Sequence, residues 1–355
     1  MTSRPPVPSR LNNFDVLRLG AALLVVGTHS FAVVAQPEPA SILDASRGTW
    51  GHFGVLIFFS ISGYLIAQSW QRDPLAGRYM LKRASRIFPA LAVMTVITAA
   101  VFGPLTTDVT LREYVASPNT WLYPIVKTAL FVPGNVDPPG IFHAVPYDGV
   151  NPSLWTLPVE FTCYTVLMIV LLTRVPPLVA TIALTVGATA LSEPALWAAT
   201  PLAGLTANAL FSQSILVMAT FFGGAALYLA RARIPLHAGV AALALIALVL
   251  VGFTPWGGLA VPFLMPYVVL SAALALPVLP LGRLRGWDLS YAVYLYGFPV
   301  QQYVVHLTQT DSALVVFILA TVALIPIAAL SWRYVEKPAL EWGRRRLRRV
   351  AEATA

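Results

Sequence analysis

The sequence has 355 residues, of which 57% are hydrophobic and 11% are charged, and its mean hydropathy is +0.73. This composition excludes an ordinary soluble domain and predicts a membrane protein. The single cysteine, Cys163, excludes an internal disulfide framework and a cysteine-rich metal site. The net charge of +8 could suggest a nucleic-acid partner, so it is compared first with membrane topology.

Ten apolar windows follow one another along the chain, each long enough to cross the hydrocarbon core of a membrane as a helix. The windows lie near 14–35, 51–70, 88–105, 153–173, 176–192, 210–230, 236–253, 259–279, 288–307 and 313–332. They are too long and too evenly apolar for barrel strands, which alternate polar and apolar residues. The sequence therefore predicts an all-α integral membrane protein with about ten transmembrane helices in a single bundle.

The basic residues predict the orientation of this bundle. If the N-terminus is cytoplasmic, 19 of the 23 Lys and Arg residues fall on the cytoplasmic side, chiefly in segments 72–86 and 333–349. This asymmetry follows the positive-inside rule, and it predicts that both termini are cytoplasmic. It also accounts for the net charge, so no nucleic-acid partner is expected. We expect a multi-pass protein of the inner (plasma) membrane, in contact with the lipid bilayer.

Charge and hydropathy divide the chain into a cytoplasmic N-terminal segment (1–13), a membrane domain (14–338) and a basic cytoplasmic tail (339–355). The long hydrophilic connection at 106–152 is rich in Pro and Gly, which predicts a structured outer loop or lid. The first window has the features of a cleaved signal sequence as well. Its ionisable residues favour a permanent span instead.

The first window carries a cation and a histidine on one helical stripe. At ~100° and ~1.5 Å per residue, Arg18 and His29 share nearly the same face and lie ~16 Å apart along the helix. One interpretation gives Arg18 a snorkelling role and His29 a packing hydrogen bond. Because an ionisable group inside a membrane costs roughly 2.5–3.5 kcal/mol, we favour a functional role for both.

Glu160 lies in the outer half of the fourth window, at a depth similar to that of His29. A carboxylate beside an imidazole orients the ring and raises its basicity, which is the arrangement that a general base needs. Equal depth does not establish contact. The alternative, that Glu160 pairs with a backbone donor or with another helix, stays open at this point.

Arg83 and Arg86 are three residues apart, so they share one face of a helix at the cytoplasmic surface. Paired guanidinium groups bind phosphate through forked hydrogen bonds, although positive-inside residues need no ligand. Four further histidines are expected at the membrane interface: His52, His143, His237 and His306. No motif has metal-binding or phosphate-cradling spacing, so no metal site is predicted.

Six motifs follow one another in the chain. They are Phe14–Arg18 with Thr28 and His29, Gly54–Ile66 with a phenylalanine pair and Ser62-Gly63, Arg83-x-x-Arg86, Ser153–Glu160, Ser290–Tyr296 with Phe298 and Pro299, and Trp332–Pro338. In this order they resemble the acyltransferase 3 family of integral membrane O-acyltransferases, over residues 14–338. Many members carry a histidine after the Tyr-Leu-Tyr segment, where this chain has Gly297, followed by Gln301 and Gln302.

The resemblance implies transfer of an acyl group, most often acetyl, from acyl-CoA to a sugar hydroxyl of a cell-envelope glycan, glycolipid or glycoside. It implies catalytic roles for His29, Glu160 and Arg18, with His29 as general base or acyl carrier. Donor binding is expected at Arg83, Arg86 and Ser62. Other motif residues expected at the site are Asp15, Trp155, Tyr294, Tyr296, Gln301 and Glu336. Acyl-CoA is the implied co-substrate, with no permanently bound cofactor.

The main alternative is a transporter or flippase for a lipid-linked sugar, because many spans with buried His, Arg and Glu also suit a polar pathway. The sequence has no evident repeats or paired broken helices, which disfavours this alternative. A non-catalytic scaffold would leave the intramembrane charges without a purpose. The choice between acetyl and a longer acyl group, the side of the membrane on which transfer occurs and the oligomeric state stay open.

Overall fold

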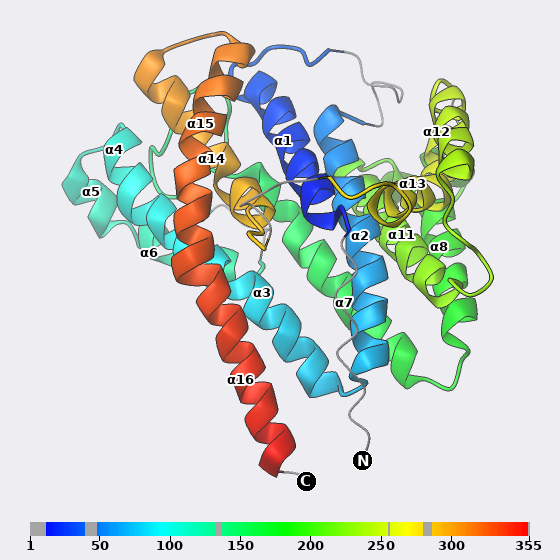
Figure 1. The fold of residues 1–355 in the computed structure, drawn as a ribbon. Coiled ribbons are helices and arrows are strands. Elements are labelled where there is room, and N and C mark those ends of the chain that lie inside the picture. The colour runs from blue at the N-terminus through cyan, green and yellow to red at the C-terminus, as the bar shows by residue number, and fades with distance from the viewer. Residues whose placement is uncertain (1–11, 40–47, 132–135, 255, 280–285, 354–355) are drawn as a thin grey trace.

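The structure, a computed structural model, describes residues 12–39, 48–131, 136–254, 256–279 and 286–353 (Figure 1). Within these ranges the chain is helical and contains no β-strand, so the predicted all-α class is confirmed. Most of the predicted N-terminal segment, 1–13, lies outside the described residues.

Every predicted apolar window contains a helix. The α-helices are α1 (Phe14–Val33), α2 (Trp50–Arg72), α3 (Ala76–Ile97), α4 (Gly103–Thr106), α5 (Leu111–Ala116), α6 (Pro118–Thr128), α7 (Thr156–Leu172), α8 (Pro177–Leu191), α9 (Pro194–Trp197), α10 (Ala203–Thr206), α11 (Ala209–Leu229), α12 (Ala238–Gly252), α13 (Gly257–Leu274), α14 (Ser290–Thr308), α15 (Ala313–Ser331) and α16 (Lys337–Ala353). Two π-helical turns, Thr98–Phe102 and Trp332–Glu336, continue α3 into α4 and α15 into α16. A 3-10 turn, Pro152–Trp155, leads into α7.

Seven continuous helices in the described residues are long and apolar enough to cross a membrane. They are α1, α2, α3 with α4, α7 with its 3-10 turn, α11, α13, and α15 with most of α16. The apolar helices α8 and α12 have 15 residues each and are therefore short for a full crossing. The chain is a multi-pass membrane protein; ten crossings and cytoplasmic termini stay predictions.

Two helices extend beyond their predicted apolar windows. The third helix begins at Ala76, not near residue 88, so the helical face that Arg83 and Arg86 share belongs to α3 itself. The last window, 313–332, matches α15, but the π-helical turn then carries the chain directly into α16. In both places basic side chains lie on a helix whose other side packs against the protein, and an apolar window alone misses such a helix.

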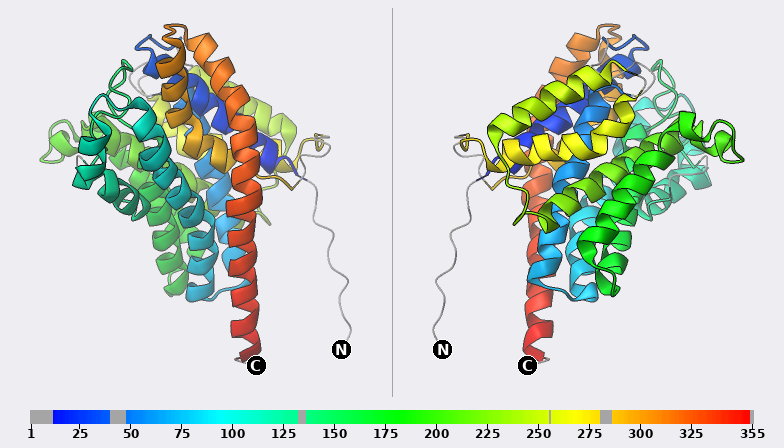
Figure 2. Two further views of the ribbon diagram at one scale, coloured as in Figure 1. Left: turned by 90° about the vertical axis from the view of Figure 1, so that its left-hand side faces the viewer. Right: turned by 90° about the vertical axis from the view of Figure 1, so that its right-hand side faces the viewer.

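The helices form two lobes on either side of α2. α14 and α15 pack on α1, while α8, α11, α12 and α13 form a second group, to the right in Figure 1. α2 contacts both α1 and α11. Gly63 lets α2 approach α11 closely, since a Cβ there would lie 1.9 Å from the carbonyl oxygen of Phe221. α16 packs against α3 and projects past the other helices (Figure 2).

The predicted outer connection, 106–152, is structured in its described part. α5 begins with a capping box in which the Thr110 side chain accepts from the Glu113 backbone and the Glu113 carboxylate accepts from Thr110. Tyr114 donates a 2.7 Å hydrogen bond to the carbonyl of Ala99, which attaches this connection to the π-helical turn after α3. The segment 132–135 of this connection lies outside the described residues.

Candidate active site

A cavity of ≈ 400 Å³ lies between α1, α2, α3, α7, α14 and the junction of α15 with α16; we name it the charged cavity. Its charged and hydroxyl-bearing lining residues are Arg18, Ser62, Lys82, Arg83, Arg86, Thr156, Glu160, Tyr164, Asp288, Ser290, Tyr291, Tyr294 and Arg344. Five of these side chains are cations and two are carboxylates, so the lining favours an anionic ligand. Six predicted site residues line the cavity: Arg18, Ser62, Arg83, Arg86, Glu160 and Tyr294.

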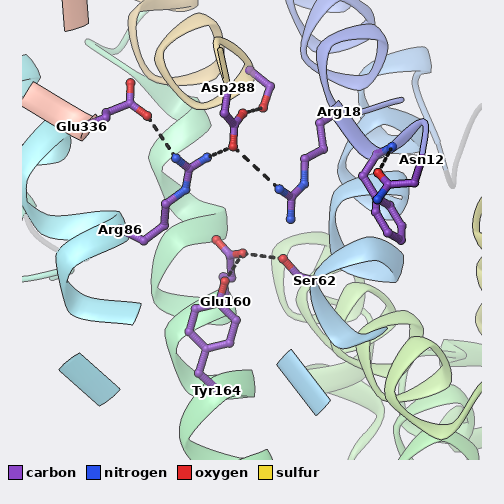
Figure 3. A network of polar contacts seen from close by, with 10 residues as sticks. Asn12, Arg18, Ser62, Arg86, Glu160, Tyr164, Asp288 and Glu336 are labelled. Carbon is purple, nitrogen blue, oxygen red and sulfur yellow. Dashed lines mark hydrogen bonds and ion pairs between the residues drawn. The ribbon is translucent and has the colours of Figure 1, made fainter. Parts of the chain in front are cut away.

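An ion cluster closes one side of the cavity. Figure 3 shows the guanidinium groups of Arg86 and Arg18 directed at Asp288, with N–O distances of 2.6 Å and 3.7 Å. Arg86 also pairs with the Glu336 carboxylate at 3.2 Å. Glu336 is 2% exposed and is the last residue of the second π-helical turn. Arg86 is therefore already neutralised by two carboxylates.

Asp288 is a site residue that sequence reasoning missed. It accepts a 2.7 Å hydrogen bond from the Ser290 hydroxyl on its other carboxylate oxygen, which fixes it at the start of α14. The sequence could have identified Asp288 by its position as the first residue of the ninth apolar window. A carboxylate at the N-terminus of a helix in a membrane protein requires a partner.

Glu160 has partners of its own, and His29 is not one of them. The hydroxyl groups of Ser62 and Tyr164 both donate to its Oε1 atom, at 2.9 Å and 2.5 Å (Figure 3). Of the two alternatives for this carboxylate, the structure agrees with pairing elsewhere. Glu160 links α2 to α7 across the wall of the charged cavity.

Arg83 differs from Arg86 in its surroundings. No described carboxylate lies within ion-pair distance of Arg83, and its Nε atom is buried without a hydrogen-bond partner. Its polar contact is a 3.5 Å hydrogen bond to the Ser69 hydroxyl, and its guanidinium lies 5.9 Å from the Tyr164 ring centroid. Of the two arginines in the motif, Arg83 is the one available for a ligand.

Lys82, the neighbouring cation, also lines the cavity but is paired with a carboxylate. Its ammonium group lies 2.7 Å from the carboxylate of Asp73, in the short connection between α2 and α3. The hydrogen bond from Lys82 holds the pKa of Asp73 below its usual range, and Arg78 adds to this effect. The carboxylate of Asp73 therefore remains ionised at neutral pH and partly neutralises the charge of Lys82.

His29 does not line the charged cavity; it lies behind one wall of it. Its Nδ1 atom is 3.4 Å from the Ser153 hydroxyl, and its ring packs edge-on against Phe298. The wall between the ring and the cavity contains Tyr294, whose hydroxyl donates to the carbonyl of Ser153 at 2.8 Å and lies 2.6 Å from the Thr156 hydroxyl. Ser153 thus connects the imidazole to Tyr294 and, through it, to Thr156, which both line the charged cavity.

The 3-10 turn before α7 positions Ser153 for this contact. Asn151 accepts a 3.2 Å hydrogen bond from the backbone N–H of Ser153 and donates to the carbonyl of Leu295 at 3.0 Å. The side-chain amide therefore fastens the turn to α14 and places Ser153 beside His29. Trp155, the last residue of the turn, is partly buried against the hydrophobic core.

Gln301 connects α14 to α1 one turn before His29. Its Nε2 atom donates to the carbonyl of Val26 and to the hydroxyl of Ser30, each at 2.6 Å. Gly297 allows this approach, because a Cβ there would lie 3.1 Å from a methyl group of Val26. A side chain at this position would require the Val26 side chain to shift by a few tenths of an ångström.

The remaining predicted residues lie near the site without lining the cavity. Tyr296 is 3% exposed on α14, and Asp15 is exposed in the first turn of α1. His52 lies in the first turn of α2 and is buried, and its Nε2 atom has no hydrogen-bond partner among the described residues. His143 and His237 are exposed. Among the described residues, no group of three or more His, Cys, Asp or Glu side chains could hold a metal ion.

The fold and the charged cavity define a multi-pass helical membrane protein with a cationic site and a histidine behind its wall. A family model described as an acyltransferase domain matches residues 11–333, and the chain belongs to this acyltransferase 3 family. This match confirms the family that the motifs indicated. No solved structure matches the chain.

Two curated proteins are similar to the chain over nearly their whole length. An O-acetyl transferase of Shigella phage Sf6 is 31% identical over 349 residues, covering 92% of this chain and 95% of the relative. Nodulation protein 10 of Rhizobium leguminosarum bv. viciae is 29% identical over 358 residues, covering 93% of each chain. The family and the phage relative's name support an O-acetyltransferase, so the predicted enzyme class is confirmed.

Proposed function

We propose that the protein transfers an acetyl group from acetyl-CoA to a sugar hydroxyl of a cell-envelope glycan, from a position in the inner membrane with both termini cytoplasmic. The name of the Shigella phage relative supports the transferred group. The observation that carries the proposed donor is the charged cavity, where Arg83 has no carboxylate partner among the described residues. An unpaired guanidinium favours a phosphate ligand.

The charges of the cavity favour one orientation of the proposed donor. Its phosphates would bind near Arg83, while the thin, uncharged pantetheine arm would extend past Ser62 and Glu160 towards Tyr294. Arg86 and Arg18, paired with Asp288, would keep this passage in shape rather than bind phosphate. In this arrangement the thioester reaches the wall behind which His29 lies.

His29 would act as the general base. Its imidazole accepts the proton of the sugar hydroxyl, the hydroxyl oxygen forms a bond to the thioester carbonyl carbon, and the carbon–sulfur bond breaks. The proton then passes from the imidazole to the departing thiolate of coenzyme A. Because His29 does not line the cavity, the proposed reaction requires the side chains of Tyr294 and Thr156, which lie 2.6 Å apart, to let the thioester approach the imidazole.

Mass spectrometry of envelope glycans tests this proposal. Cells that produce the wild-type chain should carry O-acetyl groups that are absent from cells without it and from cells with His29→Ala at an equal membrane level. A glycan profile that is identical in all three would contradict the proposed activity. Membership of an acyltransferase family favours acyl transfer over the alternative of a transporter. Nothing in the described part of the structure specifically supports transport.

A further inference from the structure

Part of the charged cavity is lined by residues that follow the matched family domain in the sequence. The family match ends at residue 333, whereas Leu340 and Arg344 of α16 both line the cavity. They are one helical turn apart, so one face of α16 is directed at the cavity. The sequence analysis assigned Arg344 to a basic cytoplasmic tail, where it would have no role beyond topology.

Close packing fixes this face of α16. A Cβ at Gly343 would lie 2.9 Å from the hydroxyl oxygen of Ser85, so α16 crosses α3 at these two residues. Ser85 directly precedes Arg86 and lies two residues after Arg83. The crossing point therefore brings the side chain of Arg344 to the same cavity as the arginine motif of α3.

Among the described residues, Arg344 differs from most of the other cations of the cavity because it has no carboxylate partner. Arg18, Arg86 and Lys82 each pair with a carboxylate of Asp288, Glu336 or Asp73. Among the described residues, neither Arg83 nor Arg344 has a carboxylate within ion-pair distance. Two guanidinium groups without an ionic partner, one from each crossing helix, thus line one cavity. A ligand with more than one phosphate oxygen could contact both.

We propose that Arg344 binds the phosphate end of the coenzyme A donor together with Arg83, so that α16 completes the donor site. This inference rests on the proposed function. It makes α16 a functional part of the enzyme and assigns a donor-binding residue outside the family's matched segment. The side chain of Arg344 is exposed. This exposure is consistent with a position at the cavity mouth, where a ligand from solvent would bind.

The test measures equilibrium binding to the purified full chain in lipid nanodiscs. The probes are coenzyme A, 3′-dephospho-coenzyme A and pantetheine, which lacks phosphate, and the variants are Arg344→Gln and Arg345→Gln. Arg345 is the matched control, because it is the next residue of α16, carries the same charge and pairs with Glu341 outside the charged cavity. Thermal unfolding of each variant verifies that the fold is retained.

Arg344→Gln should weaken coenzyme A binding about tenfold, as the loss of one charge-assisted contact does. Pantetheine binding should be unchanged, and Arg345→Gln should bind all three probes like the wild type. A smaller effect on 3′-dephospho-coenzyme A would assign Arg344 to the 3′-phosphate, and an equal effect would assign it to the pyrophosphate.

Two results would overturn the inference, and they differ in what else they affect. If the wild type and both variants bind coenzyme A equally, Arg344 has no role in donor binding while the proposed donor stands. If the wild type does not bind coenzyme A at all, the proposed donor fails and this inference fails with it.

Discussion

Two cavities of similar size lie in the two lobes, and their linings differ completely. The charged cavity has a volume of ≈ 400 Å³ and contains seven ionisable Arg, Lys, Asp and Glu side chains. The apolar cavity, between α8, α11, α12 and α13, has ≈ 450 Å³, and its only hydroxyl-bearing side chains are those of Thr185 and Tyr267. Volume alone would not distinguish them.

The difference between the two cavities shows where the protein places ionisable side chains, whose burial is energetically unfavourable. Ionisable side chains within a membrane protein are unfavourable unless they are paired or used. The charged cavity gathers residues from α1, α3, α7 and α14 that are more than 200 positions apart in sequence, such as Arg86 and Asp288. The apolar lobe supports α2 through α11 and contributes no Arg, Lys, Asp or Glu side chain to the described lining of its own cavity. Substitutions in the two lobes should therefore have different effects.

The largest effect is expected from the histidine behind the charged cavity. His29→Ala removes the proposed general base and should lower the transfer rate by about 10²- to 10⁴-fold. His237→Ala is the control, because His237 is an exposed histidine at the start of α12 in the apolar lobe. The measurement is acetyl transfer by membranes with equal amounts of each protein. Normal turnover by a folded His29→Ala protein would contradict the assignment.

Loss of a residue of the ion cluster should lower the stability of the protein more than it lowers donor binding. Arg86→Gln leaves the carboxylates of Asp288 and Glu336 without their main partner and should lower the free energy of unfolding by about 3 kcal/mol. Arg83→Gln removes a cation with no carboxylate partner and should leave stability nearly unchanged. Thermal unfolding followed by tryptophan fluorescence compares the two. Equal stability losses would show that the two arginines have the same role.

Arg83→Gln should instead raise the KM for acetyl-CoA about tenfold while changing kcat little, because it removes a contact made equally in the bound and transition states. Arg233→Gln, an exposed cation that follows α11 in the apolar lobe, should leave both constants unchanged. A fall in kcat with unchanged KM would move Arg83 from donor binding to the chemical step.

Glu160 and His29 should act independently. Since Glu160 bonds to Ser62 and Tyr164, replacing it with Gln should reduce the rate by a similar factor in the wild type and in a His29→Gln protein with residual activity. The expected coupling energy from this double-mutant cycle is below about 0.5 kcal/mol. A double variant no slower than His29→Gln would show that the carboxylate acts through the imidazole after all.

The smallest effect is expected in the apolar cavity. Ala244→Phe adds a ring to its lining and should change neither the KM for acetyl-CoA nor kcat, because this cavity has no group that recognises phosphate or thioester. The same kinetic assay measures this variant. A raised donor KM in Ala244→Phe would mean that the two lobes are not separate in function.

The sequence predicted the helical class, a helix in every apolar window and six residues that line the charged cavity, because hydropathy and the motifs are local signals. It placed the start of the third span near residue 88 instead of at Ala76, since an apolar window does not detect the amphipathic start of α3. It could not separate the roles of these arginines, because Arg86 meets Asp288 only after the chain folds. Equal depth of Glu160 and His29 likewise did not predict contact, as two helices at one depth can face different neighbours.

The most direct test of the central claim supplies isotopically labelled acetyl-CoA to membrane vesicles whose cytoplasmic face is accessible. Label should enter ester-linked acetyl groups of envelope glycan in vesicles with the wild-type protein and stay out of them in vesicles with His29→Ala. Label that enters glycan equally in both, or that enters none in the wild type while the protein is folded and glycan is present, would contradict an acetyl-CoA-dependent transfer through His29.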